Sequence, residues 1–296
     1  MGRRPQGPRR VVAVGLAVAM VGIVSIGLLA RGPKAEAERG DVHVVPVGPF
    51  TTPQVTSYLA TRSGNITMAL YDYLTGRTYL YRPGVSETTA SIIKVEILAT
   101  LLHEAEVAHQ PLDDATADLA TRMIENSDDN AAQALWDQEG GSAAVASFGA
   151  LAGLTQTVPN SQGFWGLSTT TAADQLAVLK AVVYPNPLLD APSRVYETGL
   201  MEDVEADQQW GVSGGVPNGV TVATKDGWDP LDDGTTWQIN SIGWINGEGR
   251  DYLMAVLTNG NSSEGYGIQT IEGVAPLVWA YMAPAPQPTP ATSKGQ

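Results

Sequence analysis

Strand-like segments lie near both ends of this 296-residue chain, and the stretch between them is helical in pattern. Residues 65–73 alternate apolar and polar side chains, and residues 77–81 return after a Thr-Gly turn as the second half of a hairpin. The remaining strand-like runs come much later, at residues 220–224, 237–245 and 252–258. This order predicts one sheet assembled from both ends of the chain, with a helical lobe inserted between them.

The helices are predicted from caps and from the spacing of apolar residues. Thr88 or Thr89 can cap a helix that runs from about Ala90 to Glu106. Residues 112–181 contain several shorter helical pieces, and residues 267–282 form a closing amphipathic helix. The expected fold class is therefore α/β of the α+β kind: an antiparallel sheet flanked by helices, plus an all-helical lobe.

The N-terminus has the composition of a targeting segment. Four arginines precede an apolar run at residues 11–30, which is long enough to cross a bilayer as a helix. Basic residues before such a run keep the N-terminus in the cytoplasm and place the body outside. We expect a single-pass protein of the cell membrane with an extracytoplasmic domain. The alternative is a secreted protein, cleaved near the small-residue site at residues 35–37.

The expected organisation follows from these segments. It is a membrane anchor or signal segment over residues 1–37, a linker over 38–62, a folded domain over 63–283 and a disordered Pro/Ala-rich tail over 284–296.

Composition excludes several kinds of chemistry. The chain has no cysteine, which rules out disulfides, thiolate metal sites and a cysteine nucleophile. Its three histidines are too few and too scattered for a convincing zinc site, so we expect no metal and no cofactor. The net charge of −14 repels nucleic acid. We expect a monomer that binds a small molecule.

Ser91 and Lys94 lie one helical turn apart at the start of the helix expected from Ala90. Free N–H groups and the helix dipole favour a developing negative charge at such a position. Apolar neighbours can desolvate the lysine and lower its pKa, so that the neutral amine accepts the serine proton. This is an activated nucleophile that needs no histidine. The alternative is an exposed serine cap beside a solvated lysine.

A second serine, Ser127, is followed by Asp128, Asp129 and Asn130. Its hydroxyl could relay a proton to the leaving nitrogen of a substrate and bridge Lys94 and Lys225. The alternative is a helix N-cap, because serine and aspartate are favoured before a helix start. Both roles can hold at once, since a capping loop is a rigid support for a catalytic side chain.

The third motif, Lys225-Asp226-Gly227-Trp228, follows the strand-like run at 220–224. A lysine at the edge of a strand could anchor an anionic substrate, and the glycine lets the backbone approach a ligand closely. The N–H of the tryptophan, with that of the first serine, could form an oxyanion hole. The alternative is an ordinary strand end with a turn.

In this order, the three motifs resemble those of the penicillin-recognising serine hydrolases, specifically the class A β-lactamases. The order of strands and helices over residues 63–282 is similar too, and the resemblance implies a β-lactamase-like two-lobed fold. It implies that Ser91 is the nucleophile and Lys94 the base, with Ser127 as proton relay and Lys225 as the anchor of a substrate carboxylate. The further residues that it implies for substrate binding are Asp129, Asn130, Asp226, Gly227 and Trp228.

The chain departs from the family pattern at three places. Asp129 stands where the family usually has asparagine, and Asp226 stands where it usually has threonine or serine. The second change would put a like charge beside a substrate carboxylate. Class A enzymes also activate the deacylating water with a glutamate in a loop after the second motif. Here no Asp or Glu occurs from Gly140 to Ala173.

These observations predict an exported serine hydrolase that acts through a Ser91 acyl-enzyme on a β-lactam or a cell-wall peptide amide, with weak β-lactam turnover. One alternative is a D,D-peptidase-like cell-wall hydrolase. Another is a catalytically weak cell-wall binding or sensing module on the same fold. Trp165, Trp228 and Trp244 each lie near a motif or near the loop after the second motif. They could form the floor of a cleft, or they could be ordinary core residues.

Overall fold

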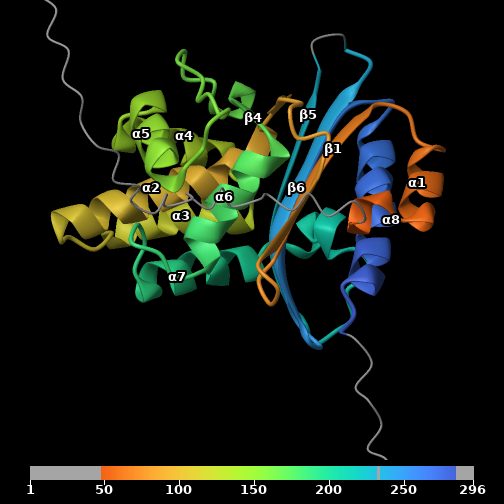
Figure 1. The fold of residues 1–296 in the computed structure, drawn as a ribbon. Coiled ribbons are helices and arrows are strands. Elements are labelled where there is room, and N and C mark those ends of the chain that lie inside the picture. The colour runs from red at the N-terminus through yellow and green to blue at the C-terminus, as the bar shows by residue number, and fades with distance from the viewer. Residues whose placement is uncertain (1–47, 232–233, 285–296) are drawn as a thin grey trace, which may run out of the picture. The chain divides into compact units, whose positions relative to one another are not determined.

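The computed structural model describes residues 48–231 and 234–284, and Figure 1 shows their fold. Five of the described strands form one antiparallel sheet in the order β2-β1-β7-β6-β5. Strand β1, from the first part of the chain, pairs with β7, which is the last strand described. The predicted assembly of the sheet from both chain ends is confirmed. Its strands are β1 (Asn65–Asp72), β2 (Arg77–Tyr81), β5 (Thr221–Pro230), β6 (Trp237–Gly247) and β7 (Arg250–Asn261).

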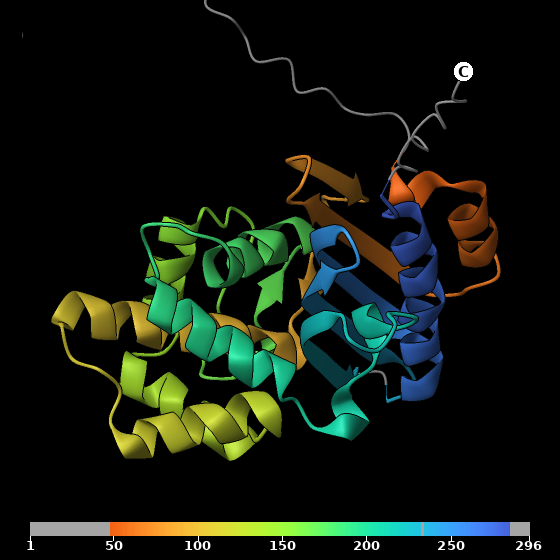
Figure 2. The same cartoon turned by 90° about the horizontal axis from the view of Figure 1, so that it is seen from below.

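Helices cover both faces of this sheet (Figures 1 and 2). One face packs against α8 (Glu264–Tyr281), outside which lies the short helix α1 (Pro53–Leu59). The Tyr58 hydroxyl donates to the backbone oxygen of Gln269 at 2.6 Å and ties α1 to α8. This short helix lies within residues 38–62, which were expected to form a linker.

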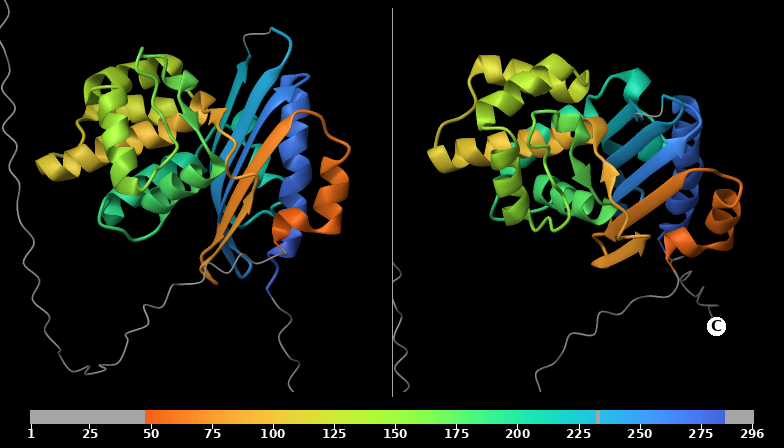
Figure 3. Two further views of the ribbon diagram at one scale, coloured as in Figure 1. Left: turned by 45° about the horizontal axis from the view of Figure 1, so that its top comes forward. Right: turned by 90° about the horizontal axis from the view of Figure 1, so that it is seen from above.

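The opposite face supports the all-helical lobe, seen on the left of the sheet in Figure 3. Helix α2 forms its centre, because every residue from Ile93 to Leu102 is buried. Helix α6 joins the lobe to the sheet through contacts with β1 and β7. The helices of the lobe are α2 (Ile93–Ala108), α3 (Asp114–Glu125), α4 (Asp129–Glu139), α5 (Ser142–Ala152), α6 (Ala172–Val183) and α7 (Ala191–Glu202). The predicted two-lobed architecture is therefore confirmed.

Three details differ from the sequence expectation, and all three affect the site. The helix expected from Ala90 begins as a short 3-10 turn, η2 (Ala90–Ile92), and Thr89 makes no capping bond. The cap of α4 is Asp128, whose Oδ1 accepts from two backbone N–H groups. Strand β5 continues to Pro230, so the third motif lies inside a strand and not at its end.

The described residues contain no helix that is long and apolar enough to cross a membrane. The anchor expected within residues 1–37 lies outside the described part of the chain.

Candidate active site

Ser91 lies in η2, where strand β5 passes very close to the backbone. A Cβ atom added to Gly227 would stand 2.7 Å from the Ser91 nitrogen and 2.9 Å from the Ile92 nitrogen. Only glycine allows this approach, which is the close backbone contact that the motif predicts. Asn240 on β6 donates its amide to the backbone oxygens of Thr88 and Thr89 at 2.8 and 2.9 Å, which holds the turn that leads into η2.

Both serines of the motifs are associated with unusual backbone conformations. Ala90, directly before Ser91, has a φ of +46°, and Ser127 itself has a φ of +54°. Residues other than glycine adopt this left-handed region only at an energetic cost, and such strain is often found at functional sites.

Lys94 points from the first turn of α2 toward Ser127 and is completely buried. Its Nζ donates to the Ser127 backbone oxygen at 2.7 Å, to the Ser127 Oγ at 3.0 Å and to the Asp129 Oδ1 at 2.7 Å. An ammonium group has three protons, and these three acceptors engage all of them. The Ser91 hydroxyl has no hydrogen-bond partner within the described ranges.

Lys225 reaches the same serine from the other side. It too is completely buried, and its Nζ donates to the Ser127 Oγ at 3.1 Å and to the Asp226 backbone oxygen at 2.9 Å. Two buried lysines therefore meet at one hydroxyl group. Because Asp128 caps helix α4, the Ser127 hydroxyl is left to accept from both amines.

Burial and mutual repulsion act on the charge of these lysines. Burial, with a further contribution from Lys94, lowers the pKa of Lys225 to about 7. Burial also lowers the pKa of Lys94, but its hydrogen bond and charge interaction with Asp129 oppose that shift. Asp129, which stands where the family usually has asparagine, thus favours the charged form of Lys94.

The loop between α5 and α6 brings an aromatic ring, not a carboxylate, to the site. The ring of Trp165, in the 3-10 turn η3 (Trp165–Leu167), has its centroid 4.8 Å from the Lys94 Nζ. The Thr89 hydroxyl holds this turn beside η2 by bonding to the Gly166 backbone oxygen at 3.3 Å. Position 165 was predicted only as cleft floor or core, because its contact with Lys94 depends on the course of the loop.

Asp174 is the first acidic residue after this loop, and its carboxylate is already hydrogen-bonded to other groups. Its carboxylate accepts from the backbone nitrogens of Thr155 and Gln156, at 3.2 and 2.7 Å, and from the Thr157 hydroxyl at 2.8 Å. It therefore anchors the start of the loop to α6.

The side chain of Asp226 does not join this group, which corrects the expectation of a charged carboxylate beside the substrate. Neighbouring side chains on a strand point to opposite faces, so Lys225 faces the helical lobe and Asp226 faces the other way. The carboxyl is completely buried beside Ser241, and its Oδ1 lies 3.3 Å from the position of a Cβ on Gly211. Burial raises its pKa well above the usual range, which favours the neutral form of the carboxyl.

The other residues suggested by the motifs lie at the edges of the site or away from it. The indole of Trp228 lies on the same face as Asp226 and packs edge-on against Trp210, with ring centroids 6.0 Å apart. Asn130 is exposed in the first turn of α4. Trp244 donates its indole N–H to the Asp251 carboxylate at 2.8 Å and packs on the core of the helical lobe.

The comparisons with known proteins agree with this fold. The family model described as "Beta-lactamase enzyme family" matches residues 115–282, which is more than half of the chain. The chain therefore belongs to the β-lactamase enzyme family, as a divergent member that resembles class A.

The chain is similar in sequence to mycobacterial proteins and similar in fold to solved class A β-lactamases. Proteins named "Putative lipoprotein LppW" from Mycobacterium bovis and Mycobacterium tuberculosis are each 29% identical over 222 residues, which cover 70% of this chain and 67% of theirs. An ancestral class A β-lactamase superposes with a TM-score of 0.67 at 21% identity, covering 77% of this chain and 98% of that one. A class A β-lactamase from Mycobacterium abscessus gives 0.66 at 22% identity, covering 76% and 96%.

Proposed function

We propose that this protein is an exported serine hydrolase that forms an acyl-enzyme at Ser91 with a β-lactam or a cell-wall peptide amide. The observation that carries the proposal is the meeting of two buried lysines, Lys94 and Lys225, at the Ser127 hydroxyl. Burying two lysines beside one hydroxyl costs folding free energy, and buried titratable groups of this kind are concentrated at functional sites. Proton transfer is a function that such groups can serve, and the family of the chain supports it.

Each group has a distinct part in the proposed reaction. Neutral Lys94 accepts the proton of the Ser91 hydroxyl as its oxygen attacks the amide carbon. Ser127 then gives a proton to the leaving nitrogen and regains one from the neighbouring amine. Lys225 attracts and anchors an anionic group of the substrate. The N–H groups of Ser91 and Trp228, which the close approach at Gly227 brings near each other, stabilise the developing oxyanion.

The second half of the reaction, deacylation, lacks its usual base. The indole of Trp165 lies over Lys94, and an indole can neither accept a proton from water nor hold a hydroxide. We therefore expect the acyl-enzyme to be long-lived and β-lactam turnover to be weak. A D,D-peptidase-like hydrolase of the cell wall is the alternative substrate choice at this site.

One observation favours the alternative hypothesis, that the protein is a catalytically weak binding or sensing module. The three protons of a charged Lys94 are all directed away from Ser91, and the Asp129 ion pair favours that charge. In this reading, the fold binds a cell-wall peptide and reacts slowly or not at all.

The proposed location is outside the cytoplasm, held by the apolar segment at residues 11–30. The name of the mycobacterial relatives, a lipoprotein, supports export. Protease added to intact cells from outside should digest the body, and full protection from protease would contradict export.

The deciding experiment is covalent labelling of the purified full-length protein with a fluorescent penicillin and, separately, with a fluorophosphonate. Intact-mass analysis should find one adduct per chain on the native protein and none on Ser91→Ala. Ser147→Ala, an exposed helical serine elsewhere in the lobe, is the matched control and should label normally. Equal labelling of Ser91→Ala would refute the nucleophile, and a folded native protein that neither reagent labels would favour the binding module.

A further inference from the structure

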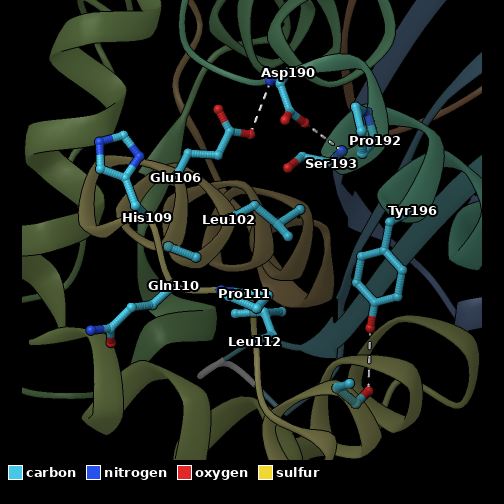
Figure 4. A pocket seen from close by; sticks show the side chains of 12 residues that line it. Leu102, Glu106, His109, Gln110, Pro111, Leu112, Asp190, Pro192, Ser193 and Tyr196 are labelled. Atoms are coloured by element: carbon cyan, nitrogen blue, oxygen red, sulfur yellow. Dashed lines mark hydrogen bonds between the residues drawn. The ribbon is translucent and has the colours of Figure 1, made fainter.

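A cavity of about 670 Å³ lies in the helical lobe, at the end of α2 opposite to Ser91 (Figure 4). It is open to solvent and is lined by residues of α2, of the connection from α2 to α3, of α3 and of the beginning of α7. Helix α2 has 16 residues and rises about 1.5 Å per residue, so the cavity is roughly 20 Å from the nucleophile. It is a separate site with the volume of a small-molecule pocket.

The interior of this cavity is apolar, with one aromatic wall. Leu102, which is buried, and Leu112, which is half-buried, line it from α2 and from the connection. The ring of Tyr196 lines it from α7, and its hydroxyl donates to the backbone oxygen of Ala117 at 3.4 Å, a bond drawn as a dashed line in Figure 4. Because this hydroxyl is already hydrogen-bonded, Tyr196 contributes mainly its ring to the lining of the cavity.

Negative charge gathers at one side of the cavity, where α2 meets the start of α7. The Glu106 Oε1 accepts from the backbone nitrogen of Asp190 at 2.9 Å, and the Asp190 Oδ1 accepts from that of Ser193 at 2.9 Å. The second oxygen of each carboxylate has no hydrogen-bond partner in the described part of the chain. Helix α2 also ends here, at Ala108, with His109 as its C-cap, and the carbonyl end of a helix favours cations.

Neither lysine nor arginine is among the residues that line the cavity, and His109 is the single lining side chain that can gain a positive charge. Arg194 on α7 lies one turn from Asp190, and its guanidinium donates to the Leu189 backbone oxygen. The N-terminus of α7 could attract an anion, but Asp190 caps it and places a carboxylate there. An apolar interior with two carboxylates at its side suits a ligand with a cationic head and an apolar body.

We propose that this cavity binds a small molecule that carries a primary ammonium group on a compact apolar body. The ammonium lies between the free oxygens of Glu106 and Asp190, and the apolar body packs against Leu102, Leu112 and the ring of Tyr196. Hydrophobic burial supplies affinity, and the carboxylates select the sign of charge. This binding does not require Ser91 and stands apart from the proposed function.

The test is isothermal titration of the full-length protein with 4-phenylbutylamine, compared with the neutral 4-phenylbutanol and the anionic 4-phenylbutyrate. The amine should bind most tightly and the carboxylate most weakly. Glu106→Gln keeps the acceptor for the Asp190 N–H but removes the charge, and it should weaken the amine about fivefold without affecting the alcohol. Glu104→Gln, on the same helix but outside the cavity lining, is the matched control.

A second variant tests the cavity itself. Ala105 is half-buried in the wall, and Ala105→Phe should fill the space and abolish binding of all three probes, with circular dichroism as the check on folding. Equal affinity for amine and carboxylate, no binding of the amine, or unchanged binding in a folded Ala105→Phe would each overturn the proposal. Penicillin labelling at Ser91 in the same preparations keeps this result separate from the fate of the proposed function.

Discussion

Replacing Asp129 by asparagine removes a charge that acts most directly on the proposed base, Lys94, and also acts on Lys225. The Asp129 Oδ1 lies 2.7 Å from the Lys94 Nζ, with the lysine fully buried and the aspartate side chain 75% exposed. Asparagine keeps an oxygen acceptor at the same place, so the hydrogen bond can persist while the negative charge is lost. The site of the lysine and its two bonds to Ser127 should be unaffected.

The magnitude follows from the nature of this pair. A hydrogen bond between charged partners contributes about 1.5–3 kcal/mol when it is shielded from water. Solvent around the exposed carboxylate reduces the charge contribution to about 1–1.4 kcal/mol, which corresponds to nearly one unit in the pKa of Lys94. At a pH below that pKa, the neutral fraction of the lysine should therefore rise about five- to tenfold.

The assay is the rate of Ser91 acylation by a fluorescent penicillin between pH 6 and pH 9. If neutral Lys94 is the base, Asp129→Asn should acylate about five- to tenfold faster at pH 7, and the rising limb of its pH profile should move to lower pH by nearly one unit. The control is Asp137→Asn, an exposed aspartate on the same helix that bonds to Gln133. A slower or unchanged rate in folded Asp129→Asn, with an unshifted profile, would refute this control of Lys94.

Three further predictions concern deacylation, backbone approach and pH. A penicillin adduct on Ser91 should persist for minutes or longer. Trp165→Glu introduces a general base beside the adduct and should shorten its lifetime by at least about tenfold. Equal adduct lifetimes in the two proteins, measured by intact mass, would contradict this. Gly227→Ala should abolish labelling, since its Cβ would stand 2.7 Å from the Ser91 nitrogen, and normal labelling would show that β5 can shift. Burial raises the pKa of Glu96 to about 8 and that of Glu139 to about 10, so the folded state holds protons that the unfolded chain releases above about pH 4.5. The stability that these groups contribute is fully present below about pH 4.5. It falls as the pH rises, until about pH 8 for Glu96 and about pH 10 for Glu139, by up to about 1.4 kcal/mol per group and pH unit. A melting temperature that rises from pH 5 to pH 8 would contradict this prediction.

Much of the fold could be predicted because its signals are local. The alternation at residues 65–73 and the turn after it lie within a few residues of each other, and they match β1 and β2 closely. Helix α1 was missed because it has only seven residues and follows a proline-rich stretch. Its one local signal is Thr52, whose hydroxyl accepts from the Val55 nitrogen, while its packing against α8 is a long-range contact.

The candidate site divides in the same way. The motifs predict that Lys94, Ser127 and Lys225 lie together. In the structure, each lysine Nζ is within hydrogen-bond distance of the Ser127 hydroxyl. The direction of Asp226 could not be read from the motif, because it depends on β5 continuing past the lysine. The place of Trp165 depends on the path of a loop with no regular periodicity, which no local pattern encodes.

The pairing of β1 with β7 has a consequence for how the chain is made. Asn65 pairs with Asn259, which is 194 positions further along the chain. Throughout synthesis, the inner edge of β1 has no partner, and contacts of such large sequence separation form slowly. A chain that stops before β7 cannot close the sheet and would expose an unpaired, apolar strand edge. Incomplete chains should therefore be substrates for chaperones and proteases rather than partly active fragments.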